Sequence, residues 1–412
     1  KSHLTKEEIQ TALDNTLKIY DMVEEYDLFQ KTIIPHATIE DFELNHLFKP
    51  AYDKFEYMKK FAYSEYEIDR YFMYLIEEGF KEHFPANTLS KEYFYKIMDR
   101  INTELRELWL ISERLGDRLS SYYVLTKEVV DTMWEEGDSI VGVARGSAAG
   151  YLVVHLLNIS QINPLDYDLP HFRHLTAERP ELPDIDLDSE QSKRMQILRA
   201  LKNKYGEDRV LNIATFSTEG SRSALLSAAR GMGIDVDEAN YLTSLIPSER
   251  GSNWSLSDCY FGNGDDRQPV TQLINEVSKY EGLMEISLKI ENLIKNNSVH
   301  ASGIYIFNNK YTKQNAMMKS STGLETTQFD MEDSDYMGGL KIDALTVSNM
   351  DKIRATMDML IEDGRIDWQG SLRETYNKYL HPKVLEYNDP KMWEKVHQND
   401  IPDLFQFDTA VN

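Results

Sequence analysis

The sequence predicts an α+β protein in which a mainly helical first part is followed by strands that a second helical block interrupts. Apolar residues recur every three or four positions through most of the first 137 residues. From residue 139 onward, short apolar segments bounded by turn residues are typical of buried strands. The helical pattern returns over residues 217–299 before the strand pattern resumes. With 412 residues and 41% hydrophobic content, the chain is long enough for two or three domains.

The first part divides into four predicted helices and a connector. The first helix lies within residues 1–25, where Thr5 followed by Glu8 predicts a capping box. Residues 26–50 form the connector. The other three helices are predicted over residues 64–83, 91–115 and 120–136. The aromatic side chains of this part are typical of a core face, so it offers no catalytic cluster.

The segment 139–144 reads as a buried strand, and Arg145-Gly146-Ser147 then forms a turn before an apolar helix through Leu157. A strand, a Gly/Ser turn and a helix N-terminus present free backbone N–H groups, which suit a phosphate. Arg145 adds a charge-assisted contact. Gly-Ser turns also open many helices that bind nothing, so the turn alone leaves phosphate binding undecided.

Two carboxylates follow in Leu182-Pro183-Asp184-Ile185-Asp186-Leu187-Asp188. In an extended strand Asp184 and Asp186 share one face, where they repel unless a cation lies between them. Hard divalent cations with oxygen ligands meet that need, and a solvated acidic strand end is the alternative. Asp188, with Gln191 three residues later, is predicted to be the N-cap of the next helix and therefore no ligand.

Further strands are predicted over residues 210–216, 300–307 and 339–345. Four helices are predicted between the first two of these strands, at residues 221–232, 236–246, 270–280 and 284–296, with a loop at 251–266. In the last strand Lys341 and Asp343 share a face. A carboxylate on an apolar strand is costly to bury without a partner, so Asp343 is a third candidate acid.

The net charge of −24 is unusual for a protein that would grip phosphate backbones. The acid excess is uneven, because the segment from Lys193 to Arg230 holds eight basic residues against three acidic ones. This segment is either a nucleic-acid track or an ordinary solvated face.

The single cysteine, Cys259, excludes a disulfide framework and a Cys-based zinc site, as expected in a reducing cytoplasm. No run of eighteen apolar residues predicts a membrane span, and no secretory leader is expected.

Several motifs occur in a characteristic order: Arg145-Gly146-Ser147, Asn163-Pro164-Leu165, Glu178-Arg179, Pro183 to Asp188, Lys204-Tyr205-Gly206, Thr215-Phe216, His300 to Gly303, Thr327 to Asp330 and Gly339 to Asp343. This ordered set resembles the catalytic core of the bacterial C-family replicative DNA polymerases, the alpha subunit of DNA polymerase III. Residues 1–20 are similar to the segment that leaves the family's PHP domain, and Phe405 to Asp408 to the start of its fingers. The composition favours a divergent or phage-type member.

The resemblance implies a palm of the polymerase-beta-like nucleotidyltransferase type with an inserted, all-helical thumb. Its implied divisions are a segment after the PHP domain (1–50), the first part of the palm (51–216), the thumb (217–299), the second part of the palm (300–350) and the connection to the fingers (351–412). Leu226 and Ser227 depart from the family, which usually carries an Arg-Asp pair there.

The resemblance also assigns site residues. Asp184, Asp186 and Asp343 fall on the family's three catalytic, metal-binding aspartates, which implies two Mg²⁺ ions, with Mn²⁺ as a substitute. The residues expected to bind the nucleotide triphosphate are Arg145, Gly146, Ser147 and Arg179. Those expected to contact DNA are Lys193, Arg222, Arg230, His300 and Lys341.

The implied function is template-directed DNA synthesis, with primer-template DNA and deoxynucleoside triphosphates (dNTPs) as partners in the cytoplasm of a bacterial or phage-infected cell. A sliding clamp and other replisome subunits would be further partners, bound through regions of the family that lie outside this chain. One alternative is a non-catalytic DNA-binding or assembly module, which the acidic surface favours and the set of three aspartates opposes. Another is a template-independent nucleotidyltransferase on the same palm.

Overall fold

The computed structural model describes residues 3–25, 27, 29, 31–85, 89–249, 251–264, 266–313, 315–386 and 388–401. The segment Phe405 to Asp408, expected to resemble the start of the fingers, lies outside the described residues. The predicted α+β class is confirmed, because a six-stranded mixed sheet is combined with many helices. Within the described part of the chain, no helix has both the length and the apolar character needed to cross a membrane.

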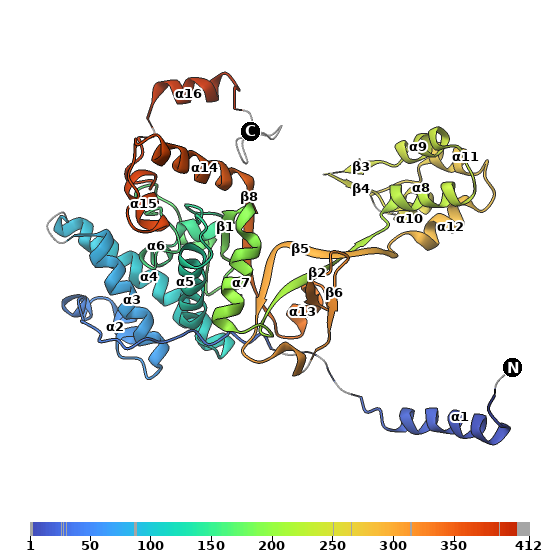
Figure 1. The fold of residues 1–412 in the computed structure, drawn as a ribbon, viewed down its shortest axis with the longest axis horizontal. Helices are drawn as coiled ribbons and strands as arrows, with labels where there is room; N and C mark the ends of the chain where they lie inside the picture. The colour runs from blue at the N-terminus through green and yellow to red at the C-terminus, as the bar shows by residue number, and fades with distance from the viewer. Residues whose placement is uncertain are drawn as a thin grey trace.

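The first helix, α1 (Lys6–Asp21), stands apart from the rest of the chain and buries none of its residues (Figure 1). Its predicted capping box is confirmed. The Glu8 N–H donates to the Thr5 hydroxyl at 3.2 Å, and the Thr5 N–H donates to the Glu8 carboxylate at 2.7 Å. These two bonds satisfy backbone donors that the first turn of a helix otherwise leaves unpaired.

The helices of the first part form the largest core with the sheet. They are α2 (Glu56–Ala62), α3 (Glu67–His83), α4 (Lys91–Leu115) and α5 (Leu119–Glu135), after a short 3₁₀ turn η1 (Lys49–Ala51). The three helices predicted here from periodicity are confirmed, and α4 ends at Gly116, whose φ of 64° suits a residue without Cβ. The aromatic side chains of α3 lie in this core, as expected.

The main sheet has the strand order β1-β8-β5-β2-β7-β6. Its strands are β1 (Asp186–Glu190), β2 (Val210–Thr218), β5 (Ile294–Ile306), β6 (Met317–Lys319), β7 (Glu325–Thr327) and β8 (Leu340–Val347). Strand β8, next to the edge strand β1, pairs with β1 in parallel and with β5 in antiparallel orientation. Strands β2 and β5 are antiparallel, and their register shifts between Asn212 and Ala214 and again between Ser217 and Thr218. The three strands predicted at 210–216, 300–307 and 339–345 are confirmed.

Two expectations around the acidic motif are wrong. Segment 139–144 forms a single bridge, Val141 to Ser189, because only a short stretch runs beside β1 before the backbone turns at Gly146. Asp188 does not cap a helix but lies inside β1, since pairing with β8 continues through Glu190. The 3₁₀ turn η5 (Gln191–Lys193) and helix α7 (Arg194–Tyr205) follow only then. The apolar helix expected after Gly150 is confirmed as a short α6 (Leu152–Leu156), and the expected turn before it contains the 3₁₀ turn η3 (Ser147–Gly150).

A second hydrophobic core lies within the chain inserted between β2 and β5, among buried residues from Ala224 to Met284. We call this part, residues 219–293, the inserted unit. Its elements are α8 (Ser221–Gly231), α9 (Val236–Ser244), β3 (Ser248–Glu249), β4 (Ser252–Asn253), α10 (Leu256–Phe261), α11 (Thr271–Val277) and α12 (Leu283–Ile290). It lies at the end of the ribbon formed by β2 and β5 (Figure 1). The loop expected at 251–266 contains β4 and α10, and the last helix ends at Ile290 because the chain then enters β5.

The last part of the chain returns to the main body. Its elements are α13 (Met331–Tyr336), α14 (Ser348–Glu362), α15 (Leu372–Tyr379) and α16 (Pro390–His397), with the 3₁₀ turns η4 (His171–Arg173) and η6 (Tyr311–Lys313) elsewhere in the chain. Tyr376 of α15 packs its ring against Trp134 of α5 at 5.3 Å. Asp351 of α14 accepts the backbone N–H groups of Gln191 and Ser192, which anchors the end of β1.

Candidate active site

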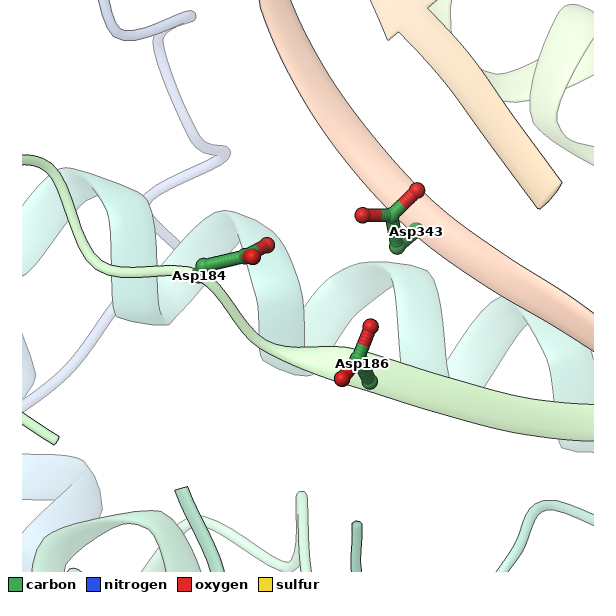
Figure 2. A group of neighbouring side chains, drawn as sticks. All are labelled: Asp184, Asp186 and Asp343. Carbon is green, nitrogen blue, oxygen red and sulfur yellow. The ribbon is translucent and has the colours of Figure 1, made fainter. Parts of the chain in front are cut away.

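Three aspartates meet at the junction of β1 and β8. Asp186 begins β1 and is the register partner of Asp343 on the parallel strand β8. Asp184 lies two residues before Asp186 on the same face, while Ile185 between them is buried. One carboxylate oxygen of each aspartate lies within 4.8 Å of the others. Figure 2 shows Asp184 on the segment that leads into β1, Asp186 on β1 and Asp343 on β8, with the three side chains in one small region of space.

The cluster concentrates negative charge that Lys341 offsets in part. Burial raises the pKa of Asp184, the Lys341 ammonium opposes this shift, and the charges of Asp343 and Asp186 add to it. The Lys341 Nζ lies 2.7 Å from Asp343 Oδ2. Burial lowers the pKa of Lys341, but the hydrogen bond to Asp343 and the nearby carboxylates raise it overall. Lys341 is therefore a cation here, and the remaining negative charge favours the binding of a further cation.

The donor set determines which cations suit the cluster. Three carboxylates without sulfur or imidazole ligands are a hard oxygen set, which fits Mg²⁺ and related divalent ions. The Ser302 hydroxyl donates to Asp343 Oδ1 at 3.2 Å and holds this buried side chain in place. The second oxygen of Asp343 faces Lys341, so both oxygens are oriented before any ion arrives.

The Gly/Ser turn lies directly beside this cluster. Gly146 has φ 61° and ψ −153°, a region essentially restricted to glycine. A Cβ at this position would lie 3.2 Å from Asp186 Oδ2. Arg145 Nη1 lies 2.8 Å from Asp188 Oδ1, and its Nε lies 3.8 Å from Asp186 Oδ2. The structure therefore brings the sequence-predicted turn and the sequence-predicted acids to one place.

A buried histidine supports the turn from behind, and sequence reasoning missed it. His174 Nδ1 lies 3.3 Å from the Ser147 hydroxyl, and its Nε2 lies 2.9 Å from the hydroxyl of Tyr123 on α5. Burial lowers the pKa of His174 to about 4, so the imidazole is neutral at pH 7. No motif or spacing marks this residue, because its partners are far away in the sequence.

The other predicted residues differ in their distance from the cluster. His300 on β5 accepts the Gly303 N–H through Nδ1 at 2.7 Å, and burial lowers its pKa although Asp343 opposes this shift. Its neutral form therefore carries the proton on Nε2. Arg179 lies in an exposed loop, 3.2 Å from the Glu181 carboxylate. The described contacts of Arg179 do not join it to the three aspartates.

The predicted DNA-contact residues outside the cluster are partly engaged in the fold. Lys193 forms an ion pair with Asp138. Arg222 and Arg230 are both exposed on helix α8, and Arg222 donates to the carbonyl of Ile246 within the inserted unit. The two departures from the family pattern also have structural roles. Leu226 packs on the core of the inserted unit, and the Ser227 hydroxyl lies 3.4 Å from Glu219.

Comparison with known proteins places this geometry in a family. Residues 70–346 match the family model described as the bacterial DNA polymerase III alpha NTPase domain. The "probable DNA polymerase YorL" of Bacillus subtilis and the "DNA-directed DNA polymerase" of Bacillus phage SPbeta are each 53% identical over 413 residues, covering 99% of this chain and 32% of the relative. The "DNA polymerase III subunit alpha" of Thermus aquaticus is 31% identical over 314 residues, covering 75% of this chain and 24% of the relative. The chain thus spans about a third or less of the length of these relatives.

Proposed function

Because this chain belongs to the family of bacterial DNA polymerase III alpha NTPase domains, we propose that it is the palm and thumb of a template-directed DNA polymerase. It would transfer deoxynucleoside monophosphates from dNTPs to a primer 3′-hydroxyl. The observation that carries the proposal is that the Arg145-Gly146-Ser147 turn lies against Asp186 of the acidic cluster. The reaction needs groups that donate hydrogen bonds to the triphosphate together with carboxylates that bind the metal ions.

Asp184, Asp186 and Asp343 would hold the metal ions. Their oxygen set fits Mg²⁺, for which Mn²⁺ can substitute. When bound, a pair of such ions lowers the pKa of the primer hydroxyl and neutralises charge on the leaving pyrophosphate. Asp184, Asp186 and Asp343 would together ligate these ions. Ser302 and Lys341 each engage one oxygen of Asp343, which orients its carboxylate.

The residues of the turn would bind the triphosphate. Gly146 allows the backbone to approach Asp186 closely, and Arg145 places a guanidinium next to the cluster. Ser147, held by His174, would direct its hydroxyl to a phosphate oxygen. Arg179 would join them from its loop. These groups bind and orient the nucleotide, so the reacting phosphate is placed against the primer terminus before chemistry begins.

The inserted unit would act as the thumb, and β1, β8, β5 and β2 would form the palm. In this division residues 51–216 and 300–350 belong to the palm, 217–299 to the thumb and 351–412 to the approach to the fingers. Arg230 on α8 would contact the duplex backbone, as would Lys193, Arg222, His300 and Lys341. Such contacts position the duplex without reading its sequence. The sequence of the product would be determined by base pairing with the template.

The test is extension of a primed template by one nucleotide with Mg²⁺, comparing the unmodified chain with Asp184→Asn. Glu325→Gln is the matched control, because Glu325 is an exposed carboxylate of β7 in the same sheet. Template-matched extension that disappears in Asp184→Asn and persists in Glu325→Gln would support the proposal. Extension that ignores the template base would indicate a template-independent nucleotidyltransferase.

An unmodified chain that extends nothing requires a second measurement, titration with Mg²⁺ and dATP. Binding that Asp184→Asn abolishes would mean that the site is competent but needs the regions present in the longer relatives. Duplex binding without Mg²⁺-dependent nucleotide binding would instead favour a non-catalytic DNA-binding module. The net charge of −24 opposes the grip on phosphate backbones that DNA synthesis needs, which keeps a non-catalytic assembly role in view as the alternative.

A further inference from the structure

We propose that Asp188 is a positioning residue that holds Arg145 at the edge of the acidic cluster, ready for the triphosphate of the incoming nucleotide. The sequence alone suggested a helix cap for this aspartate, but the structure places it within β1. The inference rests on the proposed function and deepens it. It assigns a role to the fourth carboxylate of the region, which the three-aspartate cluster does not include.

The contact distances show which carboxylate orients the guanidinium. Arg145 Nη1 lies 2.8 Å from Asp188 Oδ1, which is the length of a charge-assisted hydrogen bond. Its Nε lies 3.8 Å from Asp186 Oδ2, too far for a hydrogen bond. The Arg145 side chain is 24% exposed and the Asp188 side chain 15%, so the surrounding residues shield the contact between them from most of the solvent. Asp188 therefore fixes the direction of Arg145, and Asp186 contributes attraction only.

The backbone around this pair leaves Asp188 little freedom to move. The Gly142 N–H donates to the Asp188 carbonyl at 2.8 Å. A Cβ at residue 142 would lie 2.7 Å from the Asp188 Cβ, so glycine alone permits this approach. The space that remains between Gly142, Arg145 and Asp188 is a cavity of only about 10 Å³. The segment from Gly142 to Arg145 and strand β1 are thus packed at a fixed separation.

A separate carboxylate is needed because Asp186 has another task in the proposed reaction. An Asp186 that ligates a divalent cation attracts Arg145 less, and the ion itself repels the guanidinium. Asp188 lies two residues further along the same face of β1, and its charge stays available to Arg145. The guanidinium is then retained beside the metal site, where an anionic triphosphate would meet a cation that is already oriented. Pre-orientation of this kind lowers the entropic cost of binding.

The experiment is a double-mutant cycle on dATP binding to the full chain in the presence of Mg²⁺, measured by titration calorimetry. The variants are Asp188→Asn, Arg145→Gln and the pair together. We expect each single change to weaken dATP binding about 10-fold, the scale of one charge-assisted hydrogen bond. The double variant should bind no more weakly than Arg145→Gln alone, because Asp188 acts through Arg145. Mg²⁺ binding without nucleotide should stay unchanged in Asp188→Asn.

Asp131→Asn is the matched control. Asp131 forms a comparable, partly buried contact with Arg373 at 2.6 Å, but it lies on α5 outside the cluster. It should leave dATP binding as it is in the unmodified chain. Asp188→Ser, which is smaller and uncharged, provides a second variant should Asp188→Asn fold poorly, and it should weaken dATP binding by a similar factor.

The possible outcomes separate this inference from the proposed function. Additive losses in the cycle, or unchanged dATP affinity in Asp188→Asn and Asp188→Ser, would overturn the positioning role. If Asp184→Asn abolished dATP binding in the same series, the proposed function would still stand. Absence of any Mg²⁺-dependent dATP binding by the unmodified chain would overturn both. Loss of Mg²⁺ affinity in Asp188→Asn would make Asp188 a metal ligand instead and equally contradict the inference.

Discussion

Asp186 and Asp343 are register partners on the parallel strands β1 and β8, although 156 intervening residues, including the whole inserted unit, separate them in the sequence. Parallel pairing places their side chains on the same face, and the strand geometry extends this face to Asp184. Two of the three acids are therefore fixed by the pairing of the sheet, and Asp184 completes the cluster from the segment just before β1. The spacing of the cluster is already set in the absence of metal, as a precise site requires.

Replacing any one of the three aspartates by asparagine should abolish Mg²⁺-dependent incorporation. Metal ions supply several kcal/mol of stabilisation in such reactions, so a loss of about 10³-fold or more is expected. Single-turnover incorporation on a primed template measures this loss, and circular dichroism verifies the fold. Activity within a few fold of the unmodified chain in Asp186→Asn would rule out the assigned role.

Asp184→Asn should raise the melting temperature of the metal-free chain at pH 7. Burial and the neighbouring carboxylates raise the pKa of Asp184, so its ionised form is disfavoured in the folded state. Below the ordinary pKa of Asp184, near 4, this destabilisation of the folded state is absent. It grows as the pH rises through the raised pKa that Asp184 has in the folded chain. Thermal unfolding with and without Mg²⁺ tests this expectation. The variant should gain stability without metal and should lose the stabilisation that Mg²⁺ gives the unmodified chain.

Gly146→Ala should impair nucleotide binding and destabilise the fold. Its backbone region costs a residue with a Cβ about 1–3 kcal/mol, and the new methyl group would press on Asp186 at 3.2 Å. Gly233→Ala is a suitable control, because Gly233 also has positive φ, 75°, but has open space around its Cβ position. Chemical unfolding and dATP titration should show both defects in Gly146→Ala and only a modest stability loss in Gly233→Ala.

The stability of the chain should fall as the pH drops from about 6.5 to about 4, in part because of His174. Burial lowers its folded pKa to about 4 from an ordinary value of 6.5, so protonation favours the unfolded state in this window. The contribution is on the order of 3 kcal/mol at the acidic end. His174→Gln should flatten that part of the pH profile in urea unfolding. An unchanged profile would show that His174 is not neutral in the fold.

Two arginines of α8 should behave differently when replaced by alanine. Arg230 is exposed, and its loss should weaken duplex binding and lower the salt dependence by about one counterion. Arg222 donates to the carbonyl of Ile246, so its loss should also reduce the stability of the inserted unit. Fluorescence anisotropy across a salt series separates the two effects when it is combined with thermal unfolding. Equal salt slopes for Arg230→Ala and the unmodified chain would contradict a backbone contact.

Strand periodicity allowed much of the acidic cluster to be predicted. The rule that alternate residues share a face placed Asp184 beside Asp186 and Lys341 beside Asp343, because it depends on local geometry alone. That β1 and β8 are neighbours could not come from this rule. It followed from the family resemblance, and the structure explains it through the pairing of the two strands.

The errors arose where distant partners outweigh local preferences. Asp188 with Gln191 has the spacing of a helix cap, but pairing with β8 and the contact to Arg145 keep it in the strand. The segment 139–144 has the apolar character of a strand, yet it has room for one bridge only. His174 carries no local signal at all, because its role depends on Tyr123 and Ser147, which approach it only in the folded chain.

The register shifts in the ribbon of β2 and β5 have a mechanical consequence. Bulges bend a strand pair and interrupt its ladder, so they are places of low stiffness. The shift between Ser217 and Thr218 lies next to the inserted unit, whereas the shift between Asn212 and Ala214 reaches Gly303, where β5 begins to pair with β8. Bending at the shift between Ser217 and Thr218 would move the helices of the inserted unit while Gly303 stays paired with Asp343. A bend at that place can thus move the inserted unit while the strands that carry Asp186 and Asp343 stay paired.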